Sequence, residues 1–140
     1  MKQRKAIYMT ESDMKRLEKL LELLEEEDNV RDQDHLVQLG DELRRAKVVP
    51  SKSIHPDVVT MNSKIRVKDL NSGNETIYHL VFPGDADAKN NRISILAPIG
   101  TALIGFRAGD VVEWEVPAGL RQLKIEEIIY QPEAAGDFHL

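Results

Sequence analysis

The first third of the chain has the hydrophobic pattern of two amphipathic helices. Apolar residues recur at steps of three, four and three, first in one segment and again after a short polar one: Met14, Leu17, Leu21 and Leu24, then Leu36, Leu39, Leu43 and Ala46. Such steps place apolar side chains along one stripe of a helix, as in the seam of a coiled coil. The sequence therefore predicts a short antiparallel helical hairpin over residues 1–48.

The first helix has a recognisable start. Thr10 and Asp13 resemble a capping box, with Asp in place of the commoner Glu, and Glu11 and Asp13 suit the positive end of the helix dipole. At a rise of 1.5 Å per residue, two arms of roughly 15 residues would extend only about 20–25 Å. The predicted hairpin is therefore too short to form a domain by itself.

Beyond a predicted linker at residues 49–57, which contains two prolines and small polar residues, the period changes from helical to alternating. Segments rich in strand-forming residues follow one another, separated by turn residues: 64–68, 76–82, 92–96, 112–116 and 122–130. The Glu126-Glu127 pair interrupts the alternation of the last segment, which indicates a β-bulge.

The stretch around residues 97–103 is the only helical candidate in this second half. Residues 58–140 are therefore predicted to form an antiparallel sheet with one short helix, and the whole chain belongs to the α+β class.

Composition narrows the range of functions. With 140 residues, 41% hydrophobic and 31% charged, the chain has room for one ordinary domain, or a small domain with an appendage. A net charge of -5 argues against wrapping duplex nucleic acid, so we expect a protein partner and no sequence-specific nucleic-acid binding. The absence of cysteine, of an apolar signal core and of a bilayer-length segment predicts a soluble cytoplasmic protein without disulfides.

Two motifs resemble ligand sites but lack the necessary chemistry. Gly100 and Gly105 have the spacing of a P-loop, yet Phe106 and Arg107 stand where Lys and Ser or Thr are needed. The segment 85–96 begins like a calcium loop but has the wrong residues at its fifth, sixth and twelfth positions. With four scattered histidines as well, we expect no metal, no cofactor and no enzymatic activity.

An acidic run ends the first predicted helix, where negative charge opposes the helix dipole. It comprises Glu25, Glu26, Glu27 and Asp28, with Asp32 and Asp34 following in the connection. These residues form a candidate acidic tip of the hairpin. The alternative is a solvated charge run without a role.

Longer segments resemble two related groups of proteins. The stretch "SILAPIGTALIGFRAGD", residues 94–110, matches the signature of the bacterial Gre transcript-cleavage factors in their C-terminal, FKBP-like domain. His55, the segment 57–63 and the tail 130–137 resemble hallmarks of the Rnk family, the regulators of nucleoside diphosphate kinase. Together these likenesses cover nearly the whole chain.

The resemblance implies both a fold and a partner. In Gre factors the FKBP-like domain docks on bacterial RNA polymerase at the rim of the secondary channel, while a long coiled coil carries two carboxylates to the catalytic magnesium. By this resemblance, Pro98, Ile99, Gly100 and Leu103 lie at or beside the docking surface. The alternative is that these four residues form a turn and a buried helix whose role is only to hold the sheet together.

The resemblance also has a limit. The predicted arm is roughly half the length of a Gre arm, and the Gre tip pattern Asp-Leu-Lys-Glu-Asn does not occur in "EEEDNVRDQDH". We therefore expect a noncatalytic polymerase-binding regulator that competes with Gre factors. The alternatives are a cleavage factor with an unusual acidic tip and an FKBP-like prolyl isomerase, whose aromatic pocket three Phe, three Tyr and one Trp would supply poorly.

Overall fold

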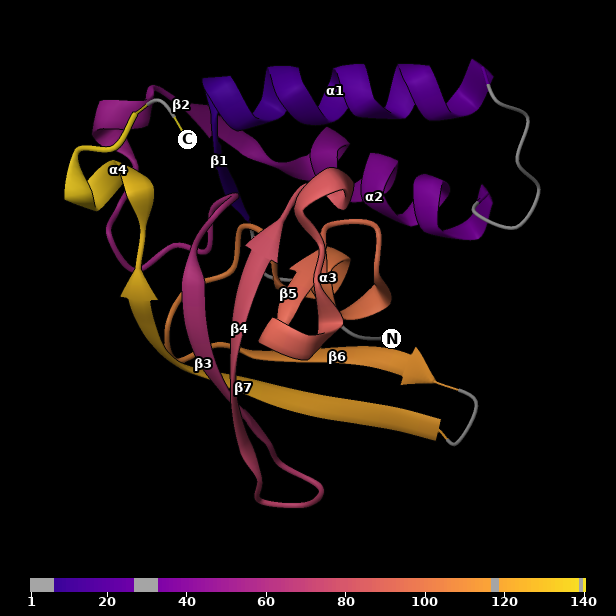
Figure 1. The fold of residues 1–140 in the computed structure, drawn as a ribbon, viewed down its shortest axis with the longest axis vertical. Helices are drawn as coiled ribbons and strands as arrows, with labels where there is room; N and C mark the ends of the chain where they lie inside the picture. Colours follow the sequence, from indigo (N-terminus) through magenta and orange to yellow (C-terminus); the bar gives the residue numbers. More distant parts are fainter. Residues whose placement is uncertain (1–6, 27–32, 117–118, 139) are drawn as a thin grey trace.

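A computed structural model describes residues 7–26, 33–116, 119–138 and 140. Two helices, α1 (Glu11–Glu26) and α2 (Gln33–Arg45), lie side by side on one side of a sheet. The short helix α3 (Pro98–Leu103) lies between α2 and the strands (Figure 1). The predicted pair of helices and the short helix at 97–103 are thus confirmed, but α3 is not the single helix of residues 58–140, because the C-terminal segment forms a further one-turn helix, α4 (Pro132–Ala135).

The sheet has five strands in the order β5-β4-β3-β7-β6. Their bounds are β3 (Lys64–Asp69), β4 (Glu75–Val81), β5 (Arg92–Ser94), β6 (Val111–Val116) and β7 (Gly119–Tyr130). The expectation of a fully antiparallel sheet is wrong, because β5 runs parallel to β4, with His79 opposite Arg92 and Val81 opposite Ser94. Two 3-10 turns, η3 (Pro83–Asp85) and η4 (Ala88–Asn90), return the chain to the level of His79 before β5 begins.

The bulge expected at the Glu126-Glu127 pair is confirmed. Val67 of β3 lies opposite Ile125 and Arg66 lies opposite Glu127, so Glu126 is the extra residue. A second irregularity leaves Ile129 extra. Because each bulge bends the strand and increases its twist, β7 curves as it crosses the sheet.

A short parallel ribbon was not expected. It pairs β1 (Tyr8–Thr10), just before α1, with β2 (Lys47–Val49), just after α2. The Lys47 amide donates to the Ile7 carbonyl, and the Tyr8 amide donates to the Gly105 carbonyl beyond α3. The two ends of the helical hairpin are therefore tied to each other and to the sheet half of the molecule.

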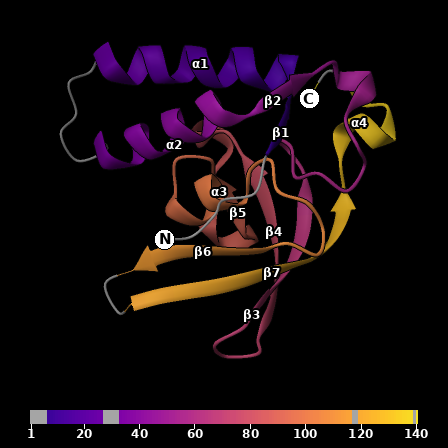
Figure 2. The ribbon, with the colours of Figure 1, turned by 180° about the vertical axis from the view of Figure 1, so that it is seen from behind.

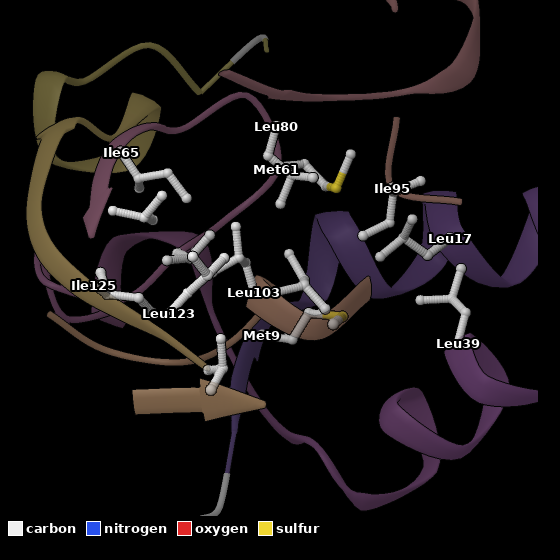
Figure 3. Packing of buried hydrophobic residues seen from close by; sticks show 14 of the residues in the cluster. Met9, Leu17, Leu39, Met61, Ile65, Leu80, Ile95, Leu103, Leu123 and Ile125 are labelled. Atoms are coloured by element: carbon white, nitrogen blue, oxygen red, sulfur yellow. The ribbon is translucent and has the colours of Figure 1, made fainter. Parts of the chain in front are cut away.

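One hydrophobic core joins the hairpin to the sheet (Figure 3). Leu17 of α1 and Leu39 of α2 have no exposed surface, and they belong to the same buried cluster as Met61, Leu80 and Leu103. The predicted apolar stripe therefore packs against the rest of this chain. The division into a hairpin at 1–48, a linker at 49–57 and a sheet domain at 58–140 stays a prediction.

Two further elements lie outside the sheet. The predicted linker contains the 3-10 turn η2 (Ser51–Ser53) and the buried Ile54, and the C-terminal segment forms the one-turn helix α4 (Pro132–Ala135). In both views α4 lies near the start of α1 (Figures 1 and 2). None of the described helices has both the length and the apolar character needed to span a membrane.

Candidate docking surface and hairpin root

Helix α3 is held against the sheet by close contacts on one side. A Cβ atom at Gly100 would overlap the Ser94 carbonyl oxygen and lie 3.1 Å from Leu80. The buried Thr101 hydroxyl donates to the Ile95 carbonyl at 2.7 Å. Ser94 ends β5 and Ile95 begins the turn after it, so these contacts with the sheet fix the orientation of α3.

The four predicted docking residues lie on different sides of α3. Leu103 has no exposed surface and Gly100 is buried, whereas Pro98 is exposed and Ile99 is half-buried. Leu103 therefore packs in the core and has no surface to offer a partner, as Figure 3 shows from close by. Pro98 and Ile99 are the two that reach the surface.

Other apolar residues of and next to α3 are also partly exposed. Leu96, Ile99 and Ala102 are half-buried and pack against the core from outside. Together with Pro98 they form what we call the α3 surface. Its chemistry suits an apolar contact with another protein more than a charged ligand.

The two glycines of the P-loop-like stretch have architectural roles. Gly100 permits the contact with Ser94 described above, and Gly105 has a φ of +82°. A Cβ on Gly105 would lie 2.6 Å from the Ile7 Cβ, and its amide donates to the Val59 carbonyl at 2.9 Å. The spacing therefore reflects two close approaches between chain segments.

Only part of the candidate acidic tip lies within the described residues. Glu27, Asp28 and Asp32 lie outside the described residues. For Glu25 and Glu26 in α1, and likewise for Asp34 in α2, only the backbone is described. The length of the arm is clearer, because the 16 residues of α1 extend about 24 Å at 1.5 Å per residue.

The root of the hairpin holds a buried carboxylate. The Asp13 amide donates to the Thr10 hydroxyl at 3.0 Å, which confirms the predicted helix cap. The Asp13 side chain, only 1% exposed, points elsewhere: it accepts the Met61 amide at 3.0 Å and Arg16 Nη2 at 2.6 Å. Burial raises the pKa of Asp13, although these two donors act in the opposite direction.

A second acid, Glu133 of α4, lies in the same region. It accepts the Thr60 hydroxyl at 2.8 Å, and Thr60 also contacts the Ser63 hydroxyl at 2.9 Å. Burial raises the pKa of Glu133, the negative charge of Asp13 raises it further, and the Thr60 hydroxyl lowers it. Two carboxylates with raised pKa values therefore face the junction of α1, α4 and the segment before β3.

Gln131 anchors the C-terminal segment next to Glu133. Its side-chain amide donates to the carbonyls of His55 and Val58, both at 2.8 Å, and its oxygen accepts the Ala134 amide at 3.1 Å. The side chain is 3% exposed with all of these groups paired. The start of the tail is thus locked to the predicted linker.

A surface cavity lies at the ribbon, on residues separate from the α3 surface. It has a volume of about 240 Å³, and its lining includes Tyr8, Ile54, His55, Val58 and Arg107. Arg107 Nε pairs with Asp57 at 3.1 Å. Within the described ranges no three His, Cys, Asp or Glu residues form a group that could hold a metal.

Sequence reasoning did not find the buried role of Asp13. The only local signal is an acid in the first helical turn with Arg16 three residues later, a spacing that also describes surface ion pairs. The contact that distinguishes Asp13 comes from Met61, 48 residues away.

Comparison with known proteins identifies the family. The family model for the C-terminal part of the transcription elongation factors GreA/GreB matches residues 54–130, and the model of the Rnk N-terminus matches residues 5–49. The regulator of nucleoside diphosphate kinase of Escherichia coli (strain K12) is 42% identical over 103 residues, covering 73% of this chain and 76% of that protein. The chain belongs to the Rnk family.

A GreA factor is similar over a smaller share of its length, whereas a solved GreA/GreB structure is covered almost completely. The transcription elongation factor GreA of Acetivibrio thermocellus is 41% identical over 93 residues, which are 66% of this chain and 58% of that protein. A solved structure of a GreA/GreB prokaryotic transcription elongation factor from Nitrosomonas europaea superimposes with a TM-score of 0.72 and 41% identity. It covers 89% of this Rnk-family chain and 99% of its own.

Proposed function

We propose that this protein is a noncatalytic regulator of transcription elongation, which docks on bacterial RNA polymerase at the rim of the secondary channel and competes there with Gre factors. One observation carries the proposal: a sheet domain of the GreA/GreB type presents the apolar α3 surface and bears an arm that is only about 24 Å long in α1. The sheet domain docks at the channel rim, and the arm blocks the entrance to Gre factors.

The absence of cleavage follows from distance. A carboxylate steers a metal-bound water only from within a few ångströms of the metal. Because the arm has about half the length that the Gre resemblance requires, its acidic residues would stop short of the catalytic magnesium. Glu25, Glu26, Glu27 and Asp28 would then act by charge on the channel entrance.

The name of the Rnk relatives adds an influence on nucleoside diphosphate kinase. Regulation of transcription accommodates such an influence without any contact between the two proteins. A direct complex is therefore not required.

A single substitution tests the docking surface. Pro98 is exposed at the first position of α3, where an acidic residue suits the helix dipole, so Pro98→Glu places a charge on the α3 surface while keeping the helix. We expect its affinity for RNA polymerase to fall at least tenfold, as for loss of a buried apolar anchor worth about 1.4 kcal/mol or more.

Pro83→Glu is the matched control, because Pro83 begins the 3-10 turn η3 in the same way. Binding is measured by fluorescence anisotropy with labelled protein and core polymerase. Equal affinity of the two variants would contradict docking through α3.

A further inference from the structure

The polar contacts at the hairpin root are not used by the proposed docking surface. They join three parts of the chain that are distant in sequence: the start of α1, the segment 60–63 and the C-terminal segment 131–140. The last two overlap the segments that resemble Rnk hallmarks. Figures 1 and 2 show the end of the chain beside the start of α1 from both sides.

We propose that polar contacts among the start of α1, the segment 60–63 and the C-terminal segment form a clasp that sets the direction of the helical hairpin relative to the sheet, with Asp13 and Arg16 as the positioning residues of the hairpin. The clasp comprises the residues that make these contacts: Asp13, Arg16, Thr60, Glu133 and Leu140.

Directionality is what the polar contacts add to the apolar core. Burial of Leu17 and Leu39 holds the hairpin on the sheet, but the hydrophobic effect is non-directional. Hydrogen bonds to charged groups have narrow distance and angle requirements. The Asp13 carboxylate accepts the Met61 amide at 3.0 Å at the base of α1, so turning α1 about its root would strain this bond.

Arg16 connects the helix to the end of the chain. Its Nη2 donates to Asp13 and, at 2.8 Å, to the Leu140 carbonyl, and its guanidinium lies 5.0 Å from the centre of the Phe82 ring. One side chain of α1 therefore contacts the C-terminal segment and the residue that follows β4. A change in hairpin direction therefore strains the contacts of Arg16 with Leu140 and Phe82.

The clasp is suited to opening as well as closing. Arg16 Nε is buried without a hydrogen-bond partner among the described residues, which carries a desolvation cost. The charges of Asp13 and Glu133 also oppose each other in the closed arrangement. Gln131 remains anchored to His55 and Val58, so opening would release the part of the tail that follows it.

For docking, this inference rests on the proposed function. If the α3 surface binds polymerase, the clasp decides whether the hairpin points into the channel or across its rim. The clasp itself is a property of the free chain and is tested without polymerase.

The absence of cysteine allows clean spin labelling. Labels at Glu22→Cys on α1 and Lys89→Cys in the sheet half report the hairpin direction as a distance distribution from pulsed electron paramagnetic resonance. Both positions are exposed. A second pair, Lys89→Cys with Leu120→Cys, reports the sheet half alone.

Two variants open the clasp by different routes. Arg16→Gln removes the charged link to Asp13 and Leu140, and Thr60→Val removes the hydroxyl that holds Glu133 while keeping the side-chain shape. The control is Arg44→Gln, which removes an exposed ion pair of the same i,i+3 spacing, with Asp41, from α2.

We expect one narrow distribution for the parent and for Arg44→Gln. Both clasp variants should broaden it or shift its maximum by about 5 Å, the step of one helical turn that packed helices take between discrete arrangements. The Lys89–Leu120 distance should not change. An unchanged Glu22–Lys89 distribution in folded Thr60→Val overturns the clasp, even where Arg16→Gln fails to fold.

Competition with a Gre factor for polymerase separates the two proposals. If the clasp variants shift the Glu22–Lys89 distance and also lose competition, the clasp and its role in docking are both supported. If they shift the distance but compete like the parent, the role of the clasp in docking is wrong. If the parent fails to bind polymerase, the proposed function fails while the distance measurement still decides the clasp.

Discussion

At the scale of single residues, Gly100 and Pro98 contribute to the α3 surface in different ways. Gly100 is buried and allows α3 to approach Ser94, whereas Pro98 is exposed at the first position of the helix. The first sets where the surface lies, and the second forms part of it. A family signature can thus mix exposed residues with buried residues that fix the backbone beneath them.

Replacing Gly100 tests this division. Gly100→Ala forces a Cβ against the Ser94 carbonyl, which is backbone and cannot yield cheaply, so we expect a loss of about 1–3 kcal/mol in the free energy of unfolding. Gly84→Ala is the control, because a Cβ there meets nothing within 4 Å. Urea denaturation measures both, and equal stability of the two variants would argue against the close contact.

At the scale of elements, the sequence predicted those that carry their own periodic signal. β3, β6 and β7 were predicted from the alternation of apolar and polar residues, β4 from its content of strand-forming residues, and the Glu126 bulge because two acids interrupt the alternation of β7. The β1-β2 ribbon has three residues in each strand, too few to show a period. The parallel β4-β5 pairing depends on the path of residues 82–91, which no local pattern specifies.

The contribution of Glu133 to the free energy of unfolding should depend on pH. Since burial raises the folded-state pKa of Glu133 above its ordinary value of 4.5, its stabilising contribution is complete below that pH and is lost as pH rises through the folded-state pKa. The unfolding free energy of the parent minus that of Glu133→Gln should therefore fall as pH rises above about 4.5.

Asp69→Asn provides a control of opposite sign. The Asn71 amide, followed by other donors, lowers the pKa of Asp69. The unfolding free energy of the parent minus that of Asp69→Asn should therefore rise with pH across the acidic range and be lost as pH falls. Urea denaturation from pH 3 to 8 follows both differences. A pH-independent difference for Glu133→Gln would contradict the buried position of this carboxylate.

At the scale of the whole molecule, one core joins the hairpin and the sheet, and polar contacts at the root add direction. The sequence predicted the α+β class, the hairpin and the position of α3 from patterns within short segments. It could not predict that Asp13 meets Met61 or that Glu133 meets Thr60, because these contacts join residues far apart in the chain. The resemblance placed Leu103 at or beside the docking surface, with a buried helix as the alternative, and in the structure Leu103 packs in the core.

A transcript-cleavage assay on a backtracked elongation complex shows whether this protein, as proposed, obstructs Gre factors at RNA polymerase. The protein is added alone and then titrated against a Gre factor. We predict no cleavage by the protein alone and a progressive loss of Gre-stimulated cleavage as its concentration rises. Cleavage by the protein alone, or undiminished Gre activity at saturating concentration, would contradict this account.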